Sequence, residues 1–322
     1  MTINIEEFLS LFNFQQAWLK VRENQGCAGT DNETIADFSR KERANLSELR
    51  ESVANNTYQP QPYKQVLIPK GNGKLRELRI PTVRDRIVQQ ALLNVIRTPI
   101  ERQFSPASFA YRPNMSYIQA VEKVAYWRDR GYSWVLDADI VKYFDNIDHQ
   151  QLLIEVRQHI ANPGILCLIK SWISAGIRTK QGLELPKKGI PQGSVVSPLL
   201  ANIYLDKFDC AISNSDVQLV RYADDFLVMA DSYERIKQAY AEVVRLLNYL
   251  KLSIHQDKTQ ITNFDRGFCF LGHGFLENAI FPIDKEKSKS KSSAKKKVQT
   301  KRRNNKDSSR NAKKQSRNRT HH

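Results

Sequence analysis

The sequence feature that most constrains the fold is a pair of adjacent acids set between two apolar segments. Asp224-Asp225 follows Gln218-Leu219-Val220 and precedes Phe226-Leu227-Val228-Met229. Two short apolar runs on either side of a polar tip are typical of a β-hairpin. Because neighbouring side chains on a strand point to opposite faces, both acids meet one ligand only where the backbone turns. For this pair taken alone, an ordinary polar turn is the alternative.

A second acidic position strengthens the functional interpretation. The apolar segment Trp134-Val135-Leu136 leads into Asp137-Ala138-Asp139, and a carboxylate that ends a buried strand is costly unless it is paired or binds a metal. Carboxylates from two strands on one sheet face suit two hard divalent cations, with Mg2+ the usual occupant. Such ions position a 3′-hydroxyl and a triphosphate for in-line phosphoryl transfer. We therefore expect Asp139, Asp224 and Asp225 to lie in one site.

The elements around these acids predict an α+β fold. Residues 133–250 are expected to form a strand, helices, a hairpin and a further helix, which is close to the split βαβ (ferredoxin-like) unit. A short strand at 66–68 is expected to lead into a turn at 69–74. The helices that the periodicity predicts are 6–22, 40–54, 84–98, 116–130, 148–160, 163–175, 198–212 and 232–250.

The excess positive charge is concentrated in the last 38 residues. Residues 285–322 hold 16 Lys and Arg against two acids, a net of +14 out of +16 for the 322-residue chain. With Val298 as the single aliphatic side chain larger than alanine, this stretch is expected to be disordered. Such a tail binds polyanions by counterion release, so nucleic acid is the expected partner. No apolar run reaches the length of a membrane span, and we expect no membrane association.

Motifs over roughly residues 15–275 follow the order of one known family. The acids lie in residues 139–149 (DIVKYFDNIDH) and 222–225 (YADD). The chain resembles a reverse transcriptase of the bacterial group II intron type, which implies the fingers and palm of a right-hand polymerase. The other matching motifs are 18–22 (WLKVR), 68–70 (IPK) with Arg76, 80–86 (IPTVRDR), 108–113 (SFAYRP), 189–193 (GIPQG), 197–202 (SPLLAN), 258–259 (KT) and 270–272 (FLG).

The resemblance implies a set of metal ligands and catalytic groups. Asp139 and Asp224 would bridge two Mg2+ ions, with Asp225 in support and the Ile140 carbonyl as a further ligand. Asp137 does not match a ligand position of the family and is interpreted as a hydrogen-bonding or solvated acid.

The resemblance also implies substrate contacts. Phe144 would lie under the incoming sugar and exclude a 2′-hydroxyl; a core aromatic is the alternative. Lys70 and Arg76 would hold the triphosphate, because cations there neutralise the charge that builds during transfer. Gln192 would contact the nucleotide or the template, and Lys258 would protonate the leaving pyrophosphate.

The expected organisation is an N-terminal extension (1–60), fingers and palm (61–284) and a disordered basic tail (285–322). Leu78-Arg79 departs from the Leu-Gly usual in the family. Family members continue into a helical thumb or maturase domain, and the 38 residues after Asp284 are too few for one. On size and missing domains we favour a CRISPR-linked enzyme, which would acquire spacers from RNA together with a CRISPR integrase. A maturase that has lost its thumb and binds intron RNA is the other choice.

The expected activity is that of an RNA-directed DNA polymerase. Its partners would be an RNA template, a DNA or RNA primer and dNTPs, and its location the bacterial cytoplasm. The first alternative is an RNA-binding splicing cofactor that has kept the fold. A nucleotidyl cyclase on the same split βαβ plan is disfavoured by the fingers motifs and by Gln192.

Overall fold

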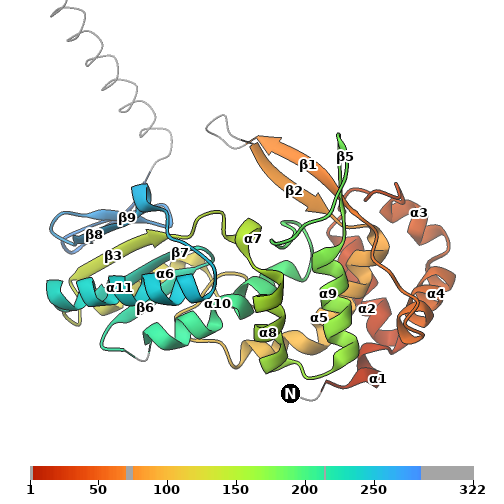
Figure 1. Cartoon of the computed structure of the whole chain (residues 1–322), viewed down its shortest axis with the longest axis horizontal. Helices are drawn as coiled ribbons and strands as arrows, with labels where there is room; N and C mark the ends of the chain where they lie inside the picture. The colour runs from red at the N-terminus through yellow and green to blue at the C-terminus, as the bar shows by residue number, and fades with distance from the viewer. Residues whose placement is uncertain (1–2, 70–74, 214, 284–322) are drawn as a thin grey trace, which may run out of the picture. The chain divides into compact units, whose positions relative to one another are not determined.

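The computed structural model describes residues 3–69, 75–213 and 215–283. The chain divides into two compact units, residues 1–263 and 264–322. All the expected site residues that the structure describes belong to the first unit (Figure 1). Of the turn expected at 69–74, Pro69 is the last residue of a strand and residues 70–74 lie outside the described residues, as does the basic tail. The boundary expected near residue 60 falls inside the first unit and stays a prediction.

A four-stranded sheet carries the acids. Its strands are β3 (Trp134–Asp139), β6 (Gln218–Tyr222), β7 (Asp225–Ala230) and β8 (Gln260–Asn263), in the order β6-β7-β3-β8. Every neighbouring pair is antiparallel. If the four strands are numbered 1 to 4 along the chain, their order in the sheet is 2-3-1-4. Helices intervene between β3 and β6 and between β7 and β8, as in the split βαβ plan. The α+β prediction with a ferredoxin-like palm is confirmed.

Helices cover this sheet (Figure 1). α11 (Tyr233–Tyr249) packs on β3 and β7, while α6 (Tyr117–Arg128) and α10 (Ser197–Ser213) contact β6. The sequence of α11 explains its placement, since its buried side chains recur every three or four residues. They are Ile236, Ala239, Val243 and Leu247.

A second four-stranded sheet forms the expected fingers, in the order β2-β1-β4-β5. β1 (Tyr63–Pro69) pairs antiparallel with β2 (Leu75–Ile80) and parallel with β4 (Ile177–Thr179), which pairs with β5 (Gly182–Glu184). The strand expected at 66–68 is longer than predicted because pairing with β2 extends it. β4 and β5 were not predicted from the sequence, since three residues are too few to show an alternation of apolar and polar side chains.

Helices fill the remainder of the first unit. The helix expected at 6–22 is two helices, because the Ser10 side chain accepts the N–H of Asn13 and starts a new one. The remaining helices are α1 (Ile5–Phe8), α2 (Leu11–Glu23), α3 (Ile35–Arg40), α4 (Glu42–Ala54), α5 (Val83–Glu101), α7 (Tyr143–Asn146), α8 (His149–His159) and α9 (Pro163–Ser174).

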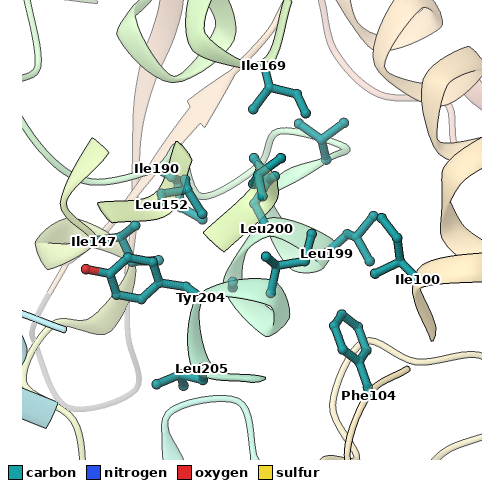
Figure 2. Close-up of a cluster of buried hydrophobic side chains, with 14 of the residues drawn as sticks. Ile100, Phe104, Ile147, Leu152, Ile169, Ile190, Leu199, Leu200, Tyr204 and Leu205 are labelled. Carbon is teal, nitrogen blue, oxygen red and sulfur yellow. The ribbon is translucent and has the colours of Figure 1, made fainter. Parts of the chain in front are cut away.

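A hydrophobic cluster packs α5, α8 and α10 against one another. Figure 2 shows side chains of α10, among them Leu199 and Leu200, between residues of α5 and residues around α8. Burying one such side chain contributes about 1.5–3 kcal/mol. The labelled members are Ile100, Phe104, Ile147, Leu152, Ile169, Ile190, Leu199, Leu200, Tyr204 and Leu205.

The second unit contains a three-stranded antiparallel sheet in the order β11-β10-β9. The strands are β9 (Phe268–Phe270), β10 (His273–Leu276) and β11 (Ala279–Pro282). Phe268 stacks on Phe275 with ring centroids 4.9 Å apart. In the part of the chain that the structure describes, no helix combines the length and the apolar character of a bilayer span.

Candidate active site

A tight hairpin presents the two adjacent acids. Tyr222 of β6 pairs with Asp225 of β7, so Ala223 and Asp224 alone connect the strands. Ala223 has φ 61°, a left-handed conformation that a two-residue hairpin turn requires and that a Cβ makes costly. The Asp224 carbonyl accepts the N–H of Ile140 at 3.1 Å. The turn is therefore joined directly to the end of β3.

The strand register brings the acids to one face of the sheet. Asp139 is the cross-strand partner of Asp225, and side chains of directly opposed residues share a face. Asp137, two residues before Asp139, points to the same side. The carboxylates of Asp137, Asp139 and Asp225 thus lie on one face, near the hairpin turn that carries Asp224. Of the three acids expected in one site, Asp139 and Asp225 are cross-strand partners and Asp224 lies in the adjoining turn.

The electrostatics of this cluster indicate excess negative charge. Burial, and after it the charges of Asp137, Asp139 and Asp224, raise the pKa of Asp225 to about 7, while the charge of Lys258 opposes them. Burial also raises the pKa of Asp137, although the amide of Gln260 donates to its carboxylate at 3.1 Å. A cation bound beside Asp225 would stabilise the charged form of its carboxylate.

Lys258 supplies part of the counter-charge. It lies in the short 3-10 helix η1 (Gln256–Lys258), and its ammonium group donates to the Asp139 carboxylate. That hydrogen bond raises the pKa of Lys258. The backbone holds the segment in place, because the N–H of His255 donates to the Asp139 carbonyl at 2.8 Å. The structure therefore places Lys258 beside Asp139, and its expected role in protonating pyrophosphate stays a prediction.

The donor set suits Mg2+ in its chemistry. Carboxylate oxygens are the ligands that this ion prefers, and a cation beside Asp225 would offset the burial and the neighbouring negative charges that raise its pKa. Among the residues with described positions, no three acid, His or Cys side chains converge closely enough to hold a metal as they stand. Asp139, whose carboxylate bonds Lys258, would have to turn toward a cation for the set to close.

Phe144 lies on α7, the short helix that follows β3. Lys142, with φ 42°, lets the chain turn from the strand into α7. The ring of Phe144 meets Tyr143 edge to face, with centroids 5.6 Å apart. The Phe144 carbonyl accepts the N–H of Ile190 at 2.8 Å, which joins α7 to the loop 189–193.

The loop 189–193 also contacts the fingers. The backbone carbonyl of Gln192 accepts a hydrogen bond from the N–H of Arg79 at 2.8 Å. The side-chain oxygen of Gln192 accepts one from Arg76 Nε at 3.2 Å. Gly193 has φ 119°, and a Cβ there would lie 3.1 Å from the Arg79 carbonyl oxygen, so glycine permits this approach. Arg76 and Gln192, 116 residues apart in sequence, are therefore neighbours, whereas Lys70 lies outside the described residues.

Two buried polar residues support these loops and were not predicted from the sequence. The Gln89 side-chain oxygen accepts from Ser194 Oγ and from the N–H of Val195, both at 2.9 Å. Arg221, 1% exposed, donates to the Ala223 carbonyl at 2.9 Å and forms a double hydrogen bond with Asp209. Arg221 lies inside the apolar strand that precedes the acids, and this signal could have identified it from the sequence.

Comparisons with known proteins agree with this geometry. Residues 68–275 match the family model described as "Reverse transcriptase (RNA-dependent DNA polymerase)". Protein YkfC of Escherichia coli K12 is 34% identical over 270 residues, which cover 72% of this chain and 71% of YkfC. The group II intron-encoded protein LtrA of Lactococcus lactis is 26% identical over 326 residues, and the match covers 80% of this chain and 54% of LtrA.

A solved structure extends the likeness to the fold. Telomerase from Candida albicans superposes with a TM-score of 0.53 at 16% identity, over 76% of this chain and 51% of that one. The fold is similar to the fingers and palm of a polymerase. The chain belongs to the reverse transcriptase family, the RNA-dependent DNA polymerases.

Proposed function

We propose that this protein is an RNA-directed DNA polymerase that adds dNTPs to a primer 3′-hydroxyl by phosphoryl transfer with two Mg2+ ions. The observation that carries the proposal is the pairing of Asp139 with Asp225 beside the turn that holds Asp224. Membership of the reverse transcriptase family supports the choice of an RNA template and of a DNA product.

Each group in the site would have a defined task. Asp139, Asp224 and Asp225 would hold the ions, with the Ile140 carbonyl as a further ligand. Bound there, Mg2+ would lower the pKa of the attacking hydroxyl and neutralise charge on the phosphates. Lys258, whose raised pKa keeps its ammonium group protonated at neutral pH, would give a proton to the leaving pyrophosphate.

The fingers and the loop 189–193 would bind the nucleotide. Arg76 would hold the triphosphate, and its contact with Gln192 supports a common role for the two side chains. Lys70 would join them in that role. Phe144 would exclude a 2′-hydroxyl at the sugar, and the hydrogen bond from the N–H of Ile190 to the Phe144 carbonyl, which joins α7 to the loop that holds Gln192, supports this proposal.

The biological setting is a separate question. The intron-encoded relatives favour, as second candidate, an RNA-binding splicing cofactor. A role in spacer acquisition with a CRISPR integrase, and a cytoplasmic location, stay predictions. Splicing of an intron RNA by the pure protein would favour the cofactor, whereas co-purification with an integrase would favour spacer acquisition.

The test of the proposed activity is primer extension on poly(rA)/oligo(dT) with dTTP and Mg2+. We expect incorporation by the unaltered chain and none by the double variant Asp224→Ala, Asp225→Ala. The matched control is Asp231→Ala, which removes an acid that follows β7 and pairs with Arg235 at 2.6 Å.

Two results would count against the proposal. One is incorporation by the double variant at the rate of the unaltered chain, which would move the chemistry to other residues. The other is tight RNA binding by the unaltered chain without any incorporation, which would favour the function of a splicing cofactor.

A further inference from the structure

The loop that precedes α6 is held rigidly against the palm. The guanidinium of Arg112 donates to the carbonyls of Ser105 and Ser108, each at 2.8 Å, and to the Glu101 carboxylate at 2.8 Å. The Ala110 carbonyl accepts from the side-chain amide of Asn202 on α10 at 2.9 Å. These bonds fix the backbone on both sides of Tyr111.

Tyr111 itself has an unusual conformation for an aromatic residue. Its φ is 64°, in the left-handed region that a Cβ disfavours by about 1–2 kcal/mol. Its side chain is 44% exposed, so burial of the ring does not account for the strain. A strained aromatic residue on a rigid loop indicates that the ring is needed where it lies.

The ring of Tyr111 lies against Phe144. The two ring centroids are 6.2 Å apart and the ring planes meet at 85°, an edge-to-face arrangement. Phe144 makes a second edge-to-face contact with Tyr143, so an aromatic ring contacts it from each of two segments. The pKa of Tyr111 is raised by burial and then by the charge of Asp224, while Arg76 opposes that effect. Tyr111 therefore lies near groups of the proposed nucleotide site.

We infer that Tyr111 is a positioning residue that holds the Phe144 ring in place and thereby sets the preference for deoxynucleotides over ribonucleotides. The inference rests on the proposed function and extends it to a residue on a different loop. The position of the Phe144 ring decides whether a 2′-hydroxyl is excluded, since a ring free to turn away leaves room for that group. The edge-to-face contact with Tyr111 restricts such a movement.

The experiment measures the selectivity ratio, kcat/KM for dTTP over kcat/KM for UTP, on poly(rA)/oligo(dT). Tyr111→Gly removes the ring and also relieves the backbone strain, so its melting temperature should stay close to that of the unaltered protein. We expect its selectivity ratio to fall about 3- to 10-fold, the order expected for loss of one aromatic pair. Tyr111→Phe, which keeps the ring, should keep the ratio, as should the control Tyr249→Ala on the exposed side of α11.

A double variant shows whether Tyr111 acts through Phe144. Adding Tyr111→Gly to Phe144→Ala should lower the ratio no further than Phe144→Ala alone. A partial loss of folded enzyme lowers both kcat/KM values equally and leaves their ratio unchanged. Incorporation with an unchanged ratio in Tyr111→Gly, or an additive double variant, would overturn the inference alone. No incorporation of dTTP by the unaltered protein would overturn the proposed function and this inference with it.

Discussion

The buried ion pair beneath the catalytic turn gives the sharpest prediction. Arg221 and Asp209 are each 1% exposed, with Arg221 Nε 2.7 Å and Nη2 2.5 Å from the two carboxylate oxygens. Arg221 also donates to Ser108 Oγ at 2.8 Å and to the Ala223 carbonyl at 2.9 Å. The test uses three variants: Arg221→Met, Asp209→Leu and the double variant that combines them.

The structure sets the size of the effect. Either single substitution leaves a buried charge without its partner, which costs about 3–5 kcal/mol of the free energy of unfolding. The double variant removes both charges, so its main loss is the unsatisfied Ala223 carbonyl, about 1–3 kcal/mol. We therefore expect the double variant to be at least as stable as either single variant.

Urea unfolding of the four proteins measures this coupling, and primer extension measures its consequence. Although the double variant folds, nothing replaces the bond from Arg221 to the Ala223 carbonyl. The turn that carries Asp224 should lose its fixed position, and incorporation should fall about tenfold or more.

An exposed pair of similar geometry is the control. Arg245 and Glu242 on α11 form two hydrogen bonds, at 2.7 and 2.6 Å, but their side chains are 68% and 39% exposed. Because solvent screens this pair, its coupling should be much smaller than that of Arg221 and Asp209. If the losses of the two buried single variants simply added in the double variant, or if the double variant incorporated dTTP at the full rate, the reasoning would be refuted.

Two further predictions concern buried polar groups away from the acids. Burial raises the pKa of Asp85 to about 6, against hydrogen bonds from Tyr58 and Thr82. The folded state keeps this proton up to about pH 6 whereas the unfolded chain releases it near pH 4, so the unaltered protein loses stability as the pH rises through that window. Urea unfolding should show Asp85→Asn gaining about 2 kcal/mol on the unaltered protein between pH 4.5 and 7, and a pH-independent difference would contradict this. Gln89→Leu removes the acceptor for Ser194 and Val195, so KM for dTTP should rise about 5- to 10-fold; steady-state kinetics with an unchanged KM would refute the role of Gln89.

The acidic cluster could be predicted from the sequence because local pattern determines it. Apolar segments on both sides of Asp224-Asp225 define a hairpin, and Asp139 ends an apolar strand of its own. Once the family order places these strands side by side, the acids meet. The sheet and its helices follow from the same patterns, as the buried positions of α11 show.

Contacts between distant segments could not be predicted in this way. Gln89 and Ser194 are 105 residues apart, and Tyr111 lies in the loop before α6 whereas Phe144 lies on α7. Neither pair leaves a local signal, since a buried glutamine on a helix and a half-exposed tyrosine on a loop are both ordinary. The short strands β4 and β5 form because β1 offers an edge to pair with, which no pattern within residues 177–184 reveals.

The most direct test of the central claim compares two acids on the same strand. Asp137 and Asp139 are two residues apart on one face, but only Asp139 is paired across the sheet with Asp225. In primer extension with Mg2+ and dTTP, Asp139→Asn should lower the incorporation rate about 100-fold or more, while Asp137→Asn should stay within about threefold of the unaltered protein. Full activity in Asp139→Asn, or an equal loss in Asp137→Asn, would contradict the assignment of the catalytic acids.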